Sequence, residues 1–233
     1  MPRPFTACSH TEVQDETYLY LNDDYPIKAY ETNEVSFVAQ PLGPASLNRK
    51  HKVVPVPLMM TDEWELIKED HGLVDRLRAI PKKHDYIFIG QCHYMGREVF
   101  KTLQLPNYVF EENPKGIFQL PSDEKKVELV KFLEKIAEAK FIFAPRGMGS
   151  SSFRLYQALM VGSVPIVTSM QDYPFADKVD WDSFSIRGNL PDLNKLIDKS
   201  QRIDFDEYSK KGKEFWDKYC RHDRLYEELK NYV

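Results

Sequence analysis

The segment RGMGSSSFR at residues 146–154 combines arginine, glycine and serine in a pattern that suits phosphate chemistry. Arginine binds phosphate oxygens through two parallel hydrogen bonds. Glycine lets a ligand approach the main chain closely, and serine supplies hydroxyl donors or a helix N-cap. The alternative is an ordinary polar turn whose two arginines face water. We expect a phosphate site, whose candidate residues are Arg146, Gly149, Ser150, Ser151, Ser152 and Arg154.

The residues around this segment predict a strand, turn, helix and second strand, which together make a βαβ unit. The apolar run FIFAP at 141–145 is ended by proline and is typical of a buried strand. LYQALMV at 155–161 predicts a helix that ends at Gly162, and VPIVTS at 164–169 predicts the second strand. The unpaired N–H groups at the start of such a helix attract an anion. The spacing matches neither the Walker loop nor the dinucleotide-binding fingerprint.

Several ordered motifs between residues 84 and 200 resemble the donor-binding half of exostosin-type glycosyltransferases. They are PRG and SFR in the segment above, ALxxGxVPxV at 158–167, YPFADKVDW at 173–181, and YIFIG at 86–90 followed by Arg97. The resemblance implies a GT-B fold, with two Rossmann-like domains facing a cleft. It also implies inverting transfer of a sugar from a UDP-sugar to a carbohydrate acceptor. UDP-xylose is one candidate donor among several.

Gln157 departs from that family, which usually has Glu at this position to touch the nucleotide ribose. An amide can bond a hydroxyl but brings no charge. Two alternatives therefore accompany the transferase hypothesis. One is a non-catalytic module that binds a nucleotide or a glycan, and the other is a sulfotransferase-like enzyme with a nucleotide donor. UDP binding would exclude the sulfotransferase, and slow hydrolysis of a UDP-sugar would exclude the non-catalytic module.

Four further residues are candidates for contact with the donor. Arg97 stands a few residues beyond a predicted strand and would add positive charge near the diphosphate. His93, in the turn after the same strand, would bond a phosphate or the sugar. Asp172 and Tyr173 lie beyond the strand predicted at 164–169 and would contact the donor sugar. The plain alternatives are a surface arginine, a structural histidine and an ordinary loop.

An inverting transfer also needs a base that takes the proton of the acceptor hydroxyl. Asp23 and Asp24 directly follow the predicted strand TYLYL at 17–21. Reactive residues of open α/β sheets lie beyond the carboxyl ends of strands, and two adjacent carboxylates can hold one at a raised pKa. We favour Asp24 as the base because Pro26 would fix its loop. A plain Asn-Asp-Asp turn is the alternative.

The sequence gives only weak indications of a metal site. DxD patterns occur at 180–182 and 204–206, but such matches are expected in an acidic chain. The resemblance implies that positive side chains and a helix end stabilise the leaving group in place of a divalent ion. We therefore expect no metal and no cofactor other than the UDP-sugar donor.

Composition narrows the class of partner. The formal net charge is −4, so bulk electrostatics do not favour nucleic acid as a ligand. The three cysteines are widely separated and show no metal-binding spacing, which favours reduced thiols in a cytosol. No apolar run approaches the ~18 residues of a membrane span. We expect a soluble, cytoplasmic protein, microbial or viral, or a shortened piece of an anchored Golgi-lumenal relative.

Alternating strands and helices predict an α/β fold. The strands are expected at 17–21, 34–39, 53–60, 86–90, 107–110, 141–145, 164–169 and 184–186. The helices are expected from Thr61, at 73–80 and 97–105, from a cap at Ser122 through a body at 127–140, at 155–161 and 191–200, and in the tail at 205–232. The predicted apolar face of the helix at 127–140 consists of Val127, Val130, Leu133, Ile136 and Ala137.

Two domains are expected from this pattern. Residues 1–83 are few for a full domain, so we predict a reduced acceptor-side domain that the C-terminal helices at 205–233 complete. Residues 84–204 are predicted to form the domain that binds the nucleotide sugar.

Overall fold

The structure is a computed structural model, which describes residues 35–38, 52–93, 96–113, 120–147, 151–169 and 171–229. Several sequence-based predictions lie outside these residues: the strand at 17–21, the candidate bases Asp23 and Asp24, and the candidate ligands Gly149 and Ser150. The strand expected at 34–39 is present as β1 (Val35–Val38), which pairs in parallel with β2 (Lys52–Pro55).

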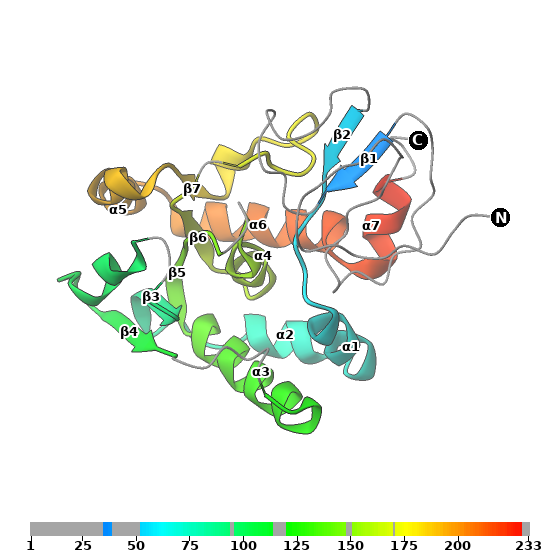
Figure 1. Ribbon diagram of the computed structural model, residues 1–233, viewed down its shortest axis with the longest axis horizontal. Helices are drawn as coiled ribbons and strands as arrows, with labels where there is room; N and C mark the ends of the chain where they lie inside the picture. The colour runs from blue at the N-terminus through cyan, green and yellow to red at the C-terminus, as the bar shows by residue number, and fades with distance from the viewer. Residues whose placement is uncertain are drawn as a thin grey trace.

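A five-stranded parallel sheet confirms the predicted α/β class (Figure 1). Its order in space is β4 (Tyr108–Glu112), β3 (His84–Gly90), β5 (Ala139–Ala144), β6 (Val164–Val167) and β7 (Ile186–Arg187). The chain builds β3 first and places β4 on one side of it. It then returns past β3 to build β5, β6 and β7 on the other side. The direction of strand order reverses between β3 and β5, and open α/β sheets bind ligands beyond the carboxyl ends of strands at such a point.

Helices cover both faces of the sheet, because the strands are apolar on both sides. In β3, Ile87 and Ile89 join one hydrophobic cluster, whereas Tyr86 and Phe88 join the other. The first cluster contains side chains from α1 (Thr61–Glu69), α2 (Leu73–Arg78), α3 (Ser122–Ala137) and α4 (Phe153–Met160). The second contains side chains from the 3-10 turn η1 (Arg97–Lys101) and from α5 (Leu193–Ser200).

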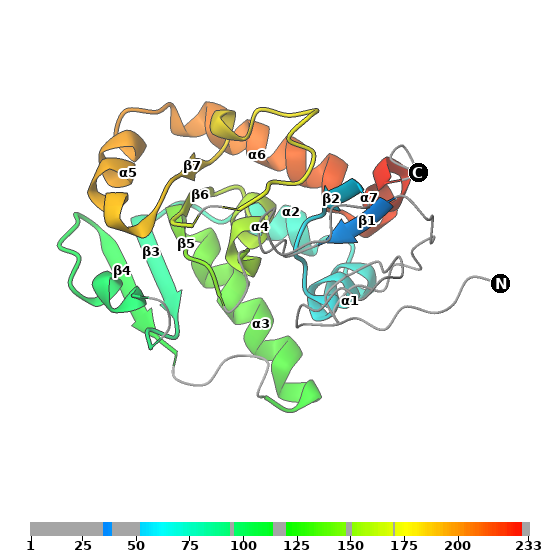
Figure 2. The ribbon, with the colours of Figure 1, turned by 45° about the horizontal axis from the view of Figure 1, so that its top comes forward.

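The C-terminal tail forms two helices, as predicted: α6 (Phe205–Tyr219) and α7 (His222–Leu229). Phe205 and Tyr208 at the start of α6 pack against the second cluster, while Phe215 and Trp216 near its end belong to the first. The helix therefore spans both faces of the sheet. Figures 1 and 2 show α5 at one end of the molecule and the β1–β2 pair beside α7 at the other.

The organising βαβ unit is present as β5, α4 and β6. Gly162 has φ +72° and follows the C-cap residue of α4, where only glycine is free of strain. The Ser163 amide donates to Ala158 O at 2.9 Å and the Gly162 amide to Leu159 O at 3.3 Å. This is the Schellman pattern, which turns the chain directly into β6.

Two predicted helices differ from the structure. The helix expected at 97–105 is only the short turn η1, because the Phe100 carbonyl accepts from the Tyr108 hydroxyl at 2.8 Å instead of from a further turn. The helix expected at 127–140 is α3, which ends at Ala137 because Ala139 begins β5. Its buried face contains Leu129, while Val127 is 54% exposed, so the expected apolar face was wrong at its first position.

Residues just before the predicted boundary share the core of the sheet. Residues 56–60 are buried, and they lie in the same hydrophobic cluster as α1, α2, α3, α4 and the end of α6. The described structure contains one five-stranded sheet with its helices, together with the small β1–β2 pair. The boundary at 83 and 84 stays a prediction. No helix among the described residues combines the length and the apolar character that crossing a membrane requires.

Candidate active site

Three of the predicted arginines meet at the carboxyl ends of β3 and β5, where the strand order reverses. Arg97 is buried and donates from Nε to Arg146 O at 3.2 Å and from Nη1 to Gln91 O at 3.2 Å. Its Nη2 donates to Arg146 O and to Pro145 O. Arg97 therefore ties the loop after β3 to the loop after β5, and it keeps the main chain of Arg146 in place.

Arg154 lies in the first turn of α4, and its guanidinium reaches over the end of β3. The Cζ atom lies 5.0 Å from the centroid of the Phe88 ring. Nε and Nη1 are buried and have no hydrogen-bond partner among the described residues. Burial, and then the charge of Arg97, lowers the pKa of Arg154 to about 9, so the group remains cationic at neutral pH. A buried guanidinium with N–H groups to spare is suited to an anionic ligand.

The start of α4 also lies at this site. Ser151 and Ser152, which precede the helix, are buried. Ser152 is the N-cap residue, but its side chain makes no capping hydrogen bond. The positive end of the α4 dipole lies at this point, and it favours negative charge nearby.

Gln157 faces a partner that the sequence did not suggest. Its Nε2 donates to the carboxylate of Glu63 and lies 3.6 Å from Met60 Sδ. Both polar side chains are buried, at 3% and 1% exposure. A glutamate at 157 would place a second carboxylate against Glu63, whereas the amide complements it. No local sequence pattern indicates this pair, because its two members are 94 residues apart and meet only in the folded chain.

The other candidates are more dispersed. His93 and Asp172 are exposed, in the loops that follow β3 and β6. Tyr173 is buried, and the Cζ atom of Arg187 lies 4.5 Å from the centroid of its ring. Burial raises the pKa of Tyr173, so this phenol is neutral at physiological pH.

Thr168, just after β6, has a buried Oγ1 with no hydrogen-bond partner among the described residues, which adds one open polar atom to the same edge of the sheet.

The DxD carboxylates have local structural partners. Asp180 accepts the Asp182 amide at 3.0 Å, and Asp182 pairs with Arg187 at 2.6 Å. Asp204 caps α6 by accepting the Glu207 amide at 3.1 Å. In the part of the chain that the structure describes, no three His, Cys, Asp or Glu side chains gather closely enough to hold a metal ion.

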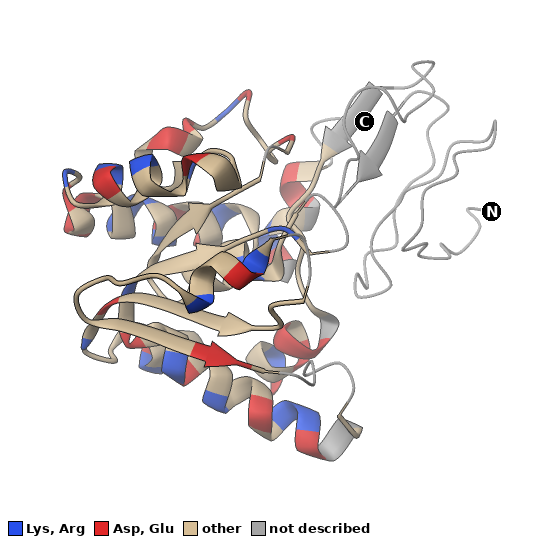
Figure 3. Ribbon diagram, turned by 60° about the vertical axis from the view of Figure 1, so that its left-hand side comes forward, with Lys and Arg blue, Asp and Glu red and all other residues tan. Residues whose placement is uncertain are grey.

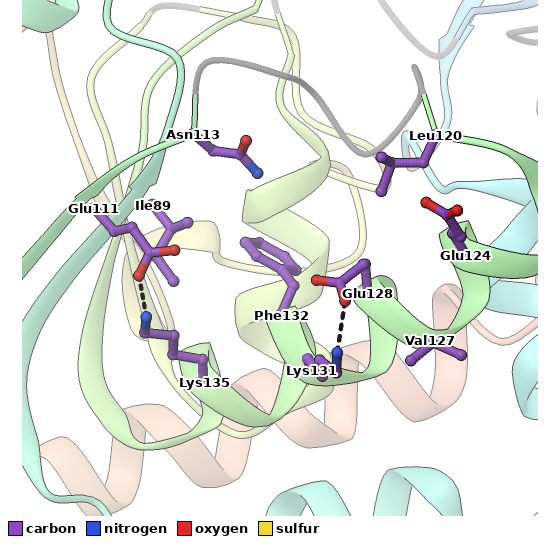
Figure 4. Close-up of a pocket in the computed structure, with 10 residues that line it drawn as sticks. All are labelled: Ile89, Glu111, Asn113, Leu120, Glu124, Val127, Glu128, Lys131, Phe132 and Lys135. Carbon is purple, nitrogen blue, oxygen red and sulfur yellow. Dashed lines mark hydrogen bonds and ion pairs between the residues drawn. The ribbon is translucent and has the colours of Figure 1, made fainter.

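A separate pocket of about 750 Å³ lies between α3 and the ends of β3 and β4 (Figure 4). Glu111, Glu124 and Glu128 line it, and Lys135 and Lys131 pair with the first and the last of these. Figure 3 shows the acidic end of β4 against an otherwise largely uncharged sheet. The three carboxylates would repel a diphosphate, so we place the anion at the arginines.

A comparison with known protein families supports this assignment. Residues 90–202 match the family model described as the Exostosin GT47 domain. The match begins at the last residue of β3 and ends after α5, so it contains Arg97, Arg146 and Arg154. The resemblance expected from the motifs is thereby confirmed over nearly the same residues. Residues 90–202 of this chain are therefore exostosin-like, in agreement with the resemblance that the motifs predicted.

Proposed function

We propose that this protein transfers a sugar from a UDP-sugar to a hydroxyl of a carbohydrate acceptor, with inversion at the anomeric carbon. UDP-xylose is one candidate donor. The observation that carries the proposal is the Arg154 guanidinium, whose Nε and Nη1 are buried without partners among the described residues at the reversal of strand order. A diphosphate would supply the missing acceptors and balance the positive charge.

The chemistry follows from what the arginines can do as the bond to the donor sugar breaks. Negative charge then builds up on the leaving UDP, and fixed positive groups stabilise it most where water is excluded. Arg154 would face the diphosphate oxygens beside the positive end of α4, and Arg97 would hold the Arg146 loop in position. Because these groups are already in place, little reorganisation is needed during the reaction. We therefore propose a transfer that needs no divalent ion.

The acceptor side of the reaction rests on residues outside those that the structure describes. We propose that a second, smaller Rossmann-like domain faces this site as in a GT-B enzyme, and that Asp24, or Asp23 beside it, deprotonates the acceptor hydroxyl. Asp24→Asn should leave UDP binding intact and abolish turnover, because only proton removal is lost. Near-normal turnover in this variant would move the base elsewhere, with Asp23 next.

The decisive experiment is a donor screen followed by NMR assignment of the product anomer. Incubation with a panel of UDP-sugars and oligosaccharide acceptors should yield one transferred sugar with inverted configuration. Turnover should persist in EDTA, and loss of activity that Mn²⁺ restores would contradict the metal-free proposal. Retention of configuration would contradict the single displacement.

A second candidate is a nucleotide-binding domain without transferase activity. The contact between Gln157 and Glu63 favours it, because an amide already bonded to a buried carboxylate is less available to a ribose. The two candidates differ in one measurement. A transferase hydrolyses its UDP-sugar slowly when no acceptor is present, whereas a binding domain binds UDP and leaves the donor intact.

A further inference from the structure

The end of β3 and the Arg154 side chain fit together closely. A methyl group built at Gly90 would lie 2.8 Å from Arg154 Cζ, and closer still to its Nη2. Such distances are far inside van der Waals contact, so no residue with a side chain fits here while Arg154 keeps its position. Gly90 is also the last residue of β3, so it lies at the carboxyl ends of the strands, where the candidate site is.

The path of the Arg154 side chain explains this requirement. The buried residues of α4 pack in the cluster that contains Ile87 and Ile89, which is one face of the sheet. Phe88 belongs to the cluster on the opposite face, yet the Arg154 guanidinium lies over its ring. The side chain must therefore cross the end of β3 to reach Phe88, and it crosses at Gly90, where no side chain stands in the way.

We propose that Gly90 and Phe88 are positioning residues for Arg154: the missing side chain of Gly90 opens the path, and the Phe88 ring supports the guanidinium from one side. The inference rests on the proposed function, since it assigns the positioned group to the donor diphosphate. The ring attracts the cation through its π face and accepts no in-plane N–H bond. Nε and Nη1 thus remain available to phosphate oxygens, which a carboxylate partner would have occupied.

The first test measures UDP affinity by calorimetry in a double-mutant cycle of Gly90→Ala and Arg154→Leu. Gly90→Ala alone should weaken binding about 10- to 100-fold, the loss expected for one or more charge-assisted hydrogen bonds. In the Arg154→Leu background the same change should cost much less, because there is no guanidinium to displace and only the strain of alanine at φ +155° remains. Equal losses in both backgrounds would overturn the proposal.

The matched control is Gly72→Ala, in the turn before α2. A methyl group there also meets an arginine, with Arg76 Nη1 at 3.0 Å, but the contact is on the surface and outside the site. It should leave UDP affinity unchanged. Phe88→Leu forms a second arm of the test, because it keeps an apolar side chain while removing the π face. It should weaken binding in the wild-type background and not in Arg154→Leu.

The pH dependence of UDP binding gives a readout that a general loss of structure would not produce. In the wild type, affinity should fall as the pH rises through about 9, where free Arg154 loses its proton. In Gly90→Ala the displaced guanidinium regains contact with water, so this alkaline fall should disappear. A fall of the same size in both proteins would contradict the assignment.

NMR of the arginine Nε–H groups separates this inference from the proposed function. Protons held over an aromatic face are shifted upfield, so Arg154 Nε–H should be shifted in the free wild type and lose that shift in Phe88→Leu and in Gly90→Ala. If the shifts behave in this way while no UDP binds, the positioning holds and the diphosphate assignment fails. If the wild type shows no shift, the positioning itself is wrong.

Discussion

At the scale of single residues, residue types and spacing indicated candidates for the site, whereas the contacts of those residues could not be predicted. Arginine types and their spacing pointed to Arg97, Arg146 and Arg154, and the structure places all three at one edge of the sheet. Glu63 and Gly90 were missed as partners of Gln157 and Arg154. Their contacts are made across long stretches of sequence, and only the folded packing creates them.

We expect Arg154 to increase the affinity for UDP and to lower the stability of the fold. Its charge is desolvated, and its N–H groups at Nε and Nη1 lack partners among the described residues. Arg154→Leu should therefore weaken UDP binding about 10- to 100-fold while leaving the melting temperature unchanged or higher. Calorimetric titration and thermal unfolding measure the two effects.

Arg76→Leu is the control for this variant, because Arg76 pairs with Asp70 on the surface. It should change neither quantity appreciably, as expected for an exposed ion pair. A large drop in melting temperature for Arg154→Leu would show that the guanidinium is structural.

At the scale of elements, the core of the βαβ unit followed from local patterns, whereas contacts between helices did not. The strands FIFAP and VPIVTS and the glycine at the end of α4 were predictable because apolar runs and left-handed turns are local features. The link between α1 and α4 through Glu63 and Gln157 joins residues that no periodicity relates.

The contact between Glu63 and Gln157 leads to a prediction about the stability of the fold. Gln157→Glu should lower the free energy of unfolding by about 2–3 kcal/mol near pH 7, because two buried carboxylates would meet and one must take up a proton. The folded-state pKa of that pair would be raised above its unfolded value. The loss should therefore be small below pH 4 and grow as the pH rises, which denaturant titrations at several pH values would show.

The reciprocal double variant is the control. Glu63→Gln combined with Gln157→Glu restores one carboxylate and one amide, and it should recover most of the lost stability. If the double variant is as unstable as the single one, the two side chains are not coupled and the contact carries little energy.

A second link joins the carboxyl ends of α3 and α4 through Lys82. Its Nζ donates to Ala137 O at 2.8 Å, to Val161 O at 3.2 Å and to Ser163 Oγ at 2.8 Å. Burial, and then the charge of Lys213, lowers the pKa of Lys82 to about 7. Against an unfolded value of about 10.4, the unfolded chain binds more protons between these two pKa values.

This difference sets the sign of the pH effect. The contribution of Lys82 to the free energy of unfolding should rise as the pH increases from about 7 to 10, by at most about 1.4 kcal/mol per pH unit. Lys82→Met should remove that rise. Comparing denaturant midpoints of the two proteins at pH 7, 8.5 and 10 isolates the contribution, and parallel curves would mean that Lys82 stays charged throughout.

At the scale of the whole molecule, alternating strands and helices predicted the parallel α/β sheet, whereas the division of the chain at residue 83 stays a prediction. Residues 56–60 and α2 share one core with the sheet, and Arg78 of α2 donates to Met160 O and to Asp217 of α6, each at 2.9 Å. Sequence patterns describe elements one at a time. They do not say which apolar faces will merge into a common core.

This shared core predicts cooperative unfolding across the proposed boundary at residue 83. The three tryptophans, Trp64, Trp181 and Trp216, are buried in the same cluster although they come from α1, the turn after β6 and α6. Tryptophan fluorescence and far-ultraviolet circular dichroism should therefore give coincident transitions in denaturant. One variant keeps Trp64 as its single tryptophan and another keeps Trp216. In each of them the fluorescence midpoint should coincide with the circular dichroism midpoint of the same variant. Separate midpoints would instead support two folding units that meet at the boundary predicted from the sequence.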